Sequence, residues 1–129
     1  MTAPWLSEAW FEAAAAEVTG VSGPPTCTGS VVVEVTGGVD GDAAGHAVFA
    51  EGRLVEAGAG PVPSPEVTLT VTDADARAVL SGDLDPAVAF MQGRLKVVGS
   101  MAPVLDLLAL TGTDDVRDRR ARIADLTAF

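Results

Sequence analysis

Apolar residues near the start of the chain recur with the period of a helix. Within residues 4–18 they stand three to four positions apart, and most of the glutamates fall elsewhere, a pattern that predicts an amphipathic helix. The apolar members are Leu6, Trp10, Ala13 or Ala14, and Val18. Gly20 ends this helix, and Ser22-Gly23-Pro24-Pro25 predicts a connector, because two prolines after a glycine continue neither a helix nor a strand ladder.

Beyond residue 28 the period changes to two, which is typical of strands. Three short strands are predicted over residues 29–36, 45–51 and 53–57, divided by glycine turns, and an antiparallel meander accommodates them most simply. Residues 66–72 predict a fourth strand, with Val67, Leu69 and Val71 on one face and threonines on the other.

The rest of the chain predicts four helices and one more strand. Asp73, Asp85 and Ser100 are each suited to begin a helix, because their side chains can accept the free amide hydrogens of a first turn. Pro86 follows Asp85 at the helix position where a missing N–H costs nothing. The predicted helices cover residues 74–80, 87–92, 101–110 and 114–129, and the strand covers 94–98.

These elements predict a single α+β domain over residues 1–129. The length suits one core, since domains usually contain roughly 100 to 200 residues. Aromatic residues make up only 5% of the chain, so the core is expected to consist of Val, Leu and Ala around a few large side chains. In the helix over 101–110 only Asp106 is charged, and such a helix must be buried on most sides or face something apolar.

The charge balance excludes some classes of partner. With a formal net charge of −10 and a pI of about 4.2, the chain is a poor ligand for nucleic acid or for a strongly anionic membrane. Four of its arginines lie in the last sixteen positions among four aspartates, which favours a self-paired, solvated helix face. No window approaches the length of a transmembrane segment. A lone Cys27 forms no internal disulfide, so a cytoplasmic location is expected.

The residue patterns of common catalytic and cofactor sites are missing. His46 stands alone in a predicted strand, Cys27 has no neighbouring His, and Ser81 lies at a helix end. The glycines form neither a dinucleotide-binding motif nor a phosphate loop. Asp40 and Asp42 resemble the start of a calcium loop, but the later bidentate Glu is not in place. No catalytic residue, metal or cofactor is predicted.

Three motifs between residues 66 and 110 carry a family resemblance. They are Val67-Thr68-Leu69-Thr70-Val71-Thr72-Asp73, then Leu80-Ser81-Gly82-Asp83-Leu84-Asp85-Pro86, then Ala89-Phe90-Met91-Gln92-Gly93-Arg94-Leu95-Lys96-Val97-Val98-Gly99-Ser100-Met101. This stretch of some forty-five residues resembles the sterol carrier protein 2 family, whereas the first sixty residues match it only in the order of elements.

The resemblance implies an SCP2-like fold: a five-stranded, mostly antiparallel sheet with helices over one face and an internal hydrophobic tunnel. It implies non-catalytic binding, and intracellular transfer, of a fatty acid, a fatty acyl-CoA or a sterol-like lipid. Carried over by position, the ligand-binding wall consists of Leu84, Val88, Phe90, Met91, Leu95, Val97, Met101, Val104, Leu105 and Leu108. Leu126 and Phe129 would be a lid or ordinary packing. The acidic composition favours holding a ligand over membrane transfer.

Two other functions stay open at this stage. One is a small enzyme or enzyme subunit that orients a hydrophobic metabolite, with His46, Glu34 or Asp106 moving a proton. The other is an interaction module whose apolar groove takes a helix or a terminus of a partner. The sequence does not identify the ligand or the oligomeric state.

Overall fold

A five-stranded sheet forms the centre of the computed structural model, which describes residues 2–129. The strand order is β4-β3-β2-β5-β6, and every neighbouring pair is antiparallel except β2 and β5, which run parallel. The strands are β2 (Gly29–Gly38), β3 (Gly41–Ala50), β4 (Arg53–Ala59), β5 (Val67–Thr72) and β6 (Leu95–Gly99). The predicted α+β fold, with its mostly antiparallel sheet of five strands, is confirmed, and so is the meander of the first three strands.

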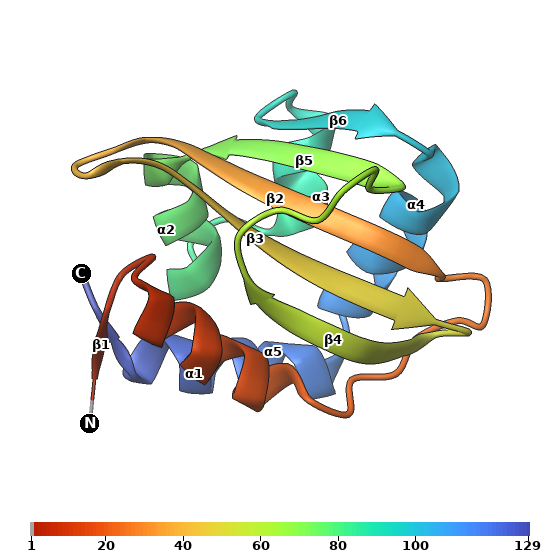
Figure 1. Cartoon of the computed structure of the whole chain (residues 1–129), viewed down its shortest axis with the longest axis horizontal. Helices are drawn as coiled ribbons and strands as arrows, with labels where there is room; N and C mark the ends of the chain where they lie inside the picture. Colours follow the sequence, from red (N-terminus) through yellow and green to blue (C-terminus); the bar gives the residue numbers. More distant parts are fainter. Residues whose placement is uncertain (1) are drawn as a thin grey trace.

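Helices cover one side of this sheet (Figure 1). In the figure α2, α3 and α4 lie behind the strands, and α1 and α5 lie side by side below them, near β4. The helices are α1 (Glu8–Val18), α2 (Asp73–Ser81), α3 (Pro86–Met91), α4 (Met101–Thr111) and α5 (Asp114–Asp125). No helix among residues 2–129 is long and apolar enough to cross a membrane.

The parallel pairing of β2 and β5 requires the chain to cross the sheet. Residues 60–66 run from the β4 edge to β5, passing in front of β3 and β2 on the side away from the helices (Figure 1). The amide of Gly60 donates to the Ala44 carbonyl at the start of this crossing, and the amide of Glu66 donates to the Ser30 carbonyl at its end. The helices and this connection therefore lie on opposite faces of the sheet.

Polar side chains begin most of the helices, as the sequence predicts, with one shift of position. Asp85 accepts from the Ala87 amide and Pro86 is the first helical residue, which confirms that prediction. The prediction that Asp73 caps α2 is wrong by one residue, because Thr72 accepts from the Asp75 amide. Asp73 is thereby free for tertiary contacts. Ser100 stands at the N-cap of α4 but makes no side-chain capping bond.

The two ends of the chain pair with each other. Strands β1 (Ala3–Pro4) and β7 (Thr127–Ala128) form a short parallel ladder, which we call the terminal clasp. The Ala3 amide donates to the Leu126 carbonyl at 2.7 Å, and the Trp5 amide donates to the Ala128 carbonyl at 2.8 Å. The last helix consequently ends at Asp125 and not at Phe129 as predicted.

The core consists of two groups of buried side chains. Val31, Val67 and Val104 pack between the middle of the sheet and α4. A second group joins the β3 strand to α4 and the connector after α1; its members are Val21, Cys27, Phe49 and Leu110. Neither group fills the space between α1 and the strands β2 and β3, and this unfilled space forms the site described next.

Candidate functional site

A cavity of about 390 Å³, partly open to solvent, lies between the helices and the sheet, and we call it the internal cavity. Its lining is apolar apart from the Arg120 side chain and the indole N–H groups of two tryptophans. His46 stands between the lining residues Gly45 and Ala47, so it borders the cavity with its backbone and its side chain points to the opposite face of the sheet. The N-terminal segment and α1 contribute Trp5, Leu6, Trp10, Phe11, Ala14, Ala15 and Val18; the sheet contributes Val33, Val35, Gly45, His46, Ala47, Ala57, Gly58, Val71 and Leu95; the other helices contribute Ala76, Val79, Leu80, Pro86, Ala89 and Arg120.

Small residues on β3 and β4 make room for this cavity. The cavity wall on these strands contains Gly45, Ala47 and Ala57, where Val or Leu would extend into the space. Gly45 pairs with Val33 on β2, and Ala47 pairs with Ala57 on β4, so the small residues form one continuous patch. A Cβ atom at Gly45 would lie 2.5 Å from Cε1 of Phe11, so the aromatic ring packs directly on the backbone of β3.

An aromatic cluster borders the cavity beside the terminal clasp. The rings of Trp5 and Trp10 meet edge to face with centroids 4.9 Å apart, and Phe11 packs on Trp10 at 5.0 Å. Phe129 packs on the outer side of Trp5 at 5.3 Å. Edge-to-face contacts of this kind favour a fixed arrangement of the rings.

Polar partners fix the two indoles. Trp10 Nε1 donates to Thr127 Oγ1 at 2.8 Å, and Trp5 Nε1 donates to Asp73 Oδ1 at 2.8 Å. Arg77 Nε donates to the other carboxylate oxygen of Asp73 at 2.7 Å. These bonds hold the pKa of the Asp73 carboxyl below its ordinary value, although burial acts in the opposite direction. The hydrogen bond from Trp5 lowers this pKa the most.

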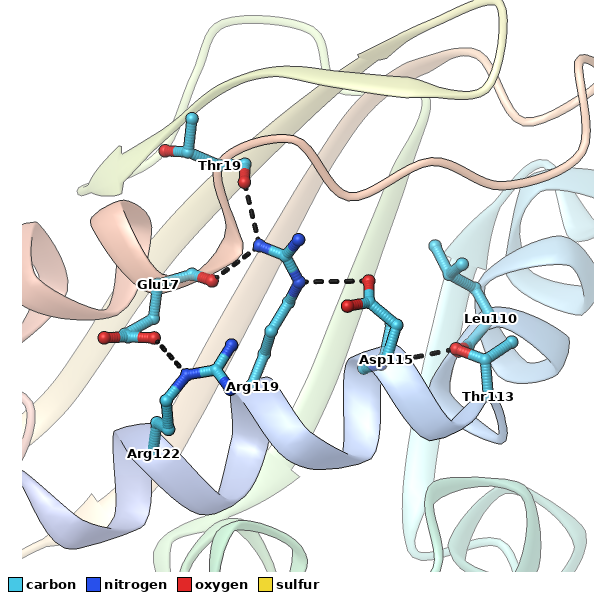
Figure 2. Close-up of polar contacts among 8 residues, drawn as sticks. Glu17, Thr19, Leu110, Thr113, Asp115, Arg119 and Arg122 are labelled. Carbon is cyan, nitrogen blue, oxygen red and sulfur yellow. Dashed lines mark hydrogen bonds and ion pairs between the residues drawn. The ribbon is translucent and has the colours of Figure 1, made fainter.

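Helix α5 is attached to α1 by two arginines (Figure 2). Arg119 Nη1 donates to the backbone carbonyls of Glu17 at 2.9 Å and Thr19 at 2.8 Å, at the end of α1, and its Nε donates to Asp115. Arg122 pairs with the Glu17 carboxylate at 2.8 Å. The carbonyls at a helix C-terminus are unpaired within the helix and favour a cation, so these contacts fix both helices that border the cavity.

The sequence-predicted ligand wall coincides with the internal cavity at Leu95 alone. Leu84 and Val104 are buried elsewhere, and Phe90, Val97 and Leu108 pack beside the core group of Val31, Val67 and Val104. The remaining four are exposed to solvent: Val88, Met91, Met101 and Leu105. Met91 is 81% exposed. A ligand contact for these nine residues stays a prediction.

The α1 side of the cavity is the part that sequence reasoning missed. Trp10, Ala14 and Val18 form the apolar stripe already visible in the sequence, so the signal for a buried face was present. The stripe does not indicate whether such a face closes a core or borders a cavity. Leu126 and Phe129, considered as a lid, are outside the lining, although Phe129 packs on the lining residue Trp5.

The groups considered for proton transfer do not form one constellation. Glu34 stands between Val33 and Val35, both of which line the cavity, so on a strand its side chain points to the opposite face. His46 Nδ1 lies 2.9 Å from the Gly60 carbonyl oxygen. Asp106, on α4, accepts a hydrogen bond from Thr26. Burial raises the pKa of the Cys27 thiol, and the nearby Asp106 charge adds to this effect, so the reactive thiolate is disfavoured.

Comparison with known proteins gives a consistent match. The model of the SCP-2 sterol transfer family matches residues 26–111. A crystal structure of sterol carrier protein 2 aligns with a TM-score of 0.69 and 20% identity, covering 91% of this chain and 98% of that one. The solution structure of palmitated SCP2L2 from Aedes aegypti aligns with a TM-score of 0.65 and 21% identity, covering 82% and 94%.

A curated relative matches over a shorter stretch. Stomatin-like protein 1 of Mus musculus is 46% identical over 46 residues, which cover 36% of this chain and 12% of that protein. The matched stretch is therefore a small part of that relative's own length.

Proposed function

Because the chain belongs to the SCP-2 sterol transfer family, we propose that it binds one lipid-like molecule in the internal cavity. The ligand class is a long apolar chain or ring system, such as a fatty acid, a fatty acyl-CoA or a sterol. The observation that carries the proposal is the apolar cavity of about 390 Å³ between α1 and the sheet. Ligand pockets in proteins occupy roughly 300–1,000 Å³ and are mostly apolar.

Burial of apolar surface supplies the binding free energy in this proposal. Each Å² of apolar ligand surface removed from water contributes about 25 cal/mol. The wall of β3 and β4 presents Ala47 and Ala57, so the proposed ligand occupies space that larger side chains would fill in an ordinary core, whereas the Phe11 ring covers Gly45. The structural relative described as palmitated supports a fatty-acyl chain as one suitable occupant of this fold.

We propose binding without catalysis. The three groups that would serve an enzyme lie apart, on β2, β3 and α4. Release to another protein or membrane belongs to the same proposal, and the acidic surface supports holding the ligand more than docking on anionic lipid.

A cavity-filling substitution tests the location of the ligand. Ala14→Phe places a ring in the internal cavity, whereas Ala9→Phe places the same ring on an exposed position of the same helix. Overfilling a packed site costs about 1–3 kcal/mol, so Ala14→Phe should weaken binding by about tenfold or more. The measurement is displacement of a fluorescent long-chain fatty acid from delipidated protein.

The matched pair makes the outcome unambiguous. Ala9→Phe should bind like the parent protein, and Ala14→Phe should keep its thermal stability, because it fills space instead of creating a clash. Equal affinity in both variants would place the ligand elsewhere. A parent protein that binds no apolar chain of any length would refute the proposal.

A further inference from the structure

Arg120 is the one formally charged side chain among the described residues that line the internal cavity. It stands on α5 four residues after Val116 and three before Ile123, the apolar positions of that helix. Helical spacing therefore places Arg120 on the packed face and not on the solvated one. A cation at the edge of an apolar cavity is costly unless an anion or hydrogen-bond acceptors compensate it.

The position of the Arg120 guanidinium is well defined. Its Nη1 donates to the Leu80 carbonyl of α2 at 2.7 Å. Beside it, a Cβ atom at Gly82 would lie 3.1 Å from Nη1 and 3.3 Å from Nη2, so the guanidinium packs against the turn that ends α2. Arg119 and Arg122 attach α5 to α1, so Arg120 projects from a helix whose position is fixed by two neighbouring side chains (Figure 2).

Most of the hydrogen-bonding capacity of Arg120 is unused within the described residues. A guanidinium has five N–H donors, and here one hydrogen bond from it is formed. Arg77, Arg94, Arg119 and Arg122 each pair with a carboxylate, whereas the half-buried Arg120, like the exposed Arg53 and Arg117, takes part in none of the ion pairs among residues 2–129. The remaining donors suit a planar, two-oxygen anion.

We propose that Arg120 binds the carboxylate head group of the ligand and that the chain therefore prefers free fatty acids to neutral lipids. The inference rests on the proposed function, because it assigns the polar end of a molecule whose apolar part lies in the same cavity. An alcohol, an ester or a sterol offers Arg120 a neutral oxygen in place of an anion. A hydrogen bond between charged groups is shorter and stronger than one to a neutral partner.

Head-group preference at constant chain length is the test. Hexadecanoic acid, hexadecanol and methyl hexadecanoate are titrated against delipidated protein at pH 8, where the free acid is ionised. The parent protein should bind the acid about 10- to 100-fold more tightly than the alcohol or the ester. In Arg120→Met the acid should lose this advantage, while the affinity for the alcohol should stay within about twofold. Arg117→Met, an exposed arginine of the same helix, controls for net charge and should keep the preference.

The possible results separate this inference from the proposed function. A parent protein that binds acid and alcohol equally, or an Arg120→Met variant that keeps the preference, would overturn the inference and leave lipid binding intact. A parent protein that binds none of the three would overturn both. If Arg120→Met does not fold, Arg120→Gln carries the same expectation, since its amide can still donate to the Leu80 carbonyl.

Discussion

Asp73 connects three segments that are far apart in the sequence. Its carboxylate accepts from Trp5 near the N-terminus and from Arg77 one turn along α2, and Arg77 stacks at 5.1 Å from the ring of Phe129. Only 15% of the Asp73 side chain is exposed, so these contacts are partly shielded from solvent. One acidic residue thus links the aromatic cluster at the cavity to both ends of the chain.

The lowered pKa of Asp73 predicts a specific dependence of stability on pH. The fold favours the ionised carboxylate, so its contribution is fully present above the unfolded pKa of about 3.9 and is lost as pH falls through the lower folded pKa. Asp73→Asn should therefore reduce the free energy of unfolding at pH 7 by about 1 kcal/mol. The difference from the parent protein should shrink below about pH 4.

Urea unfolding at pH 7 and pH 3 measures this difference. Asp40→Asn provides the control, because Asp40 lies exposed in the turn between β2 and β3. The stabilising role of the ionised Asp73 carboxylate would be contradicted by either of two results. One is a loss of unfolding free energy at pH 7 that is equally large in the control. The other is a loss for Asp73→Asn that does not diminish at pH 3.

At the scale of elements, the pairing of α5 with α1 determines the position of two cavity walls. Arg119 satisfies two backbone carbonyls at the end of α1 that have no helical partner. Hydrogen bonds to a charged donor are worth more than neutral ones, so Arg119→Met should lower the free energy of unfolding by about 2 kcal/mol. Arg117→Met, on the exposed face of the same helix, should change it little.

Urea unfolding monitored by far-ultraviolet circular dichroism provides the measurement for this pair. Two variants with the same stability would show that the contacts in Figure 2 do not hold α5 in place.

The sequence predicted elements well where residue chemistry acts locally. Glycine turns separate β2, β3 and β4, and Asp85-Pro86 begins α3, because these effects depend on a few consecutive residues. The sequence predicted Asp73 as the cap of α2 where the structure has Thr72, because both side chains are good acceptors and stand next to each other. The terminal clasp was missed, since two-residue strands have no period to detect.

The cavity wall shows a different limit of sequence reasoning. The alternation in β3 and β4 indicates which residues share a face, but Gly45, Ala47 and Ala57 look like weak core positions rather than a lining. Their role depends on where α1 lies. The position of α1 depends on the chain ends and on Arg119, which donates to Glu17 and Thr19 across 102 and 100 positions of the sequence. Side-chain packing across such distances has no local signature.

At the scale of the whole molecule, the two chain ends meet beside the cavity. The terminal clasp brings Trp5 and Phe129 together, and Thr127 holds Trp10, so both termini meet at the aromatic border of the cavity. Under the proposed function, a ligand that enters on this side would pass segments held by a short ladder and a few side-chain bonds, while the sheet behind is continuous.

The cavity also makes the protein respond to hydrostatic pressure. Unfolding releases internal void volume, and the volume change of unfolding, usually about −20 to −100 mL/mol, grows with that void. The proposed lipid would bind only the folded protein and fill this cavity, so delipidated protein should unfold at a lower pressure than protein loaded with hexadecanoic acid. The emission of Trp5 and Trp10 during compression would report the transition, and equal midpoints for the two forms would argue against a ligand inside. If the proposed lipid fills the cavity, the loaded protein should also be less compressible than the delipidated one.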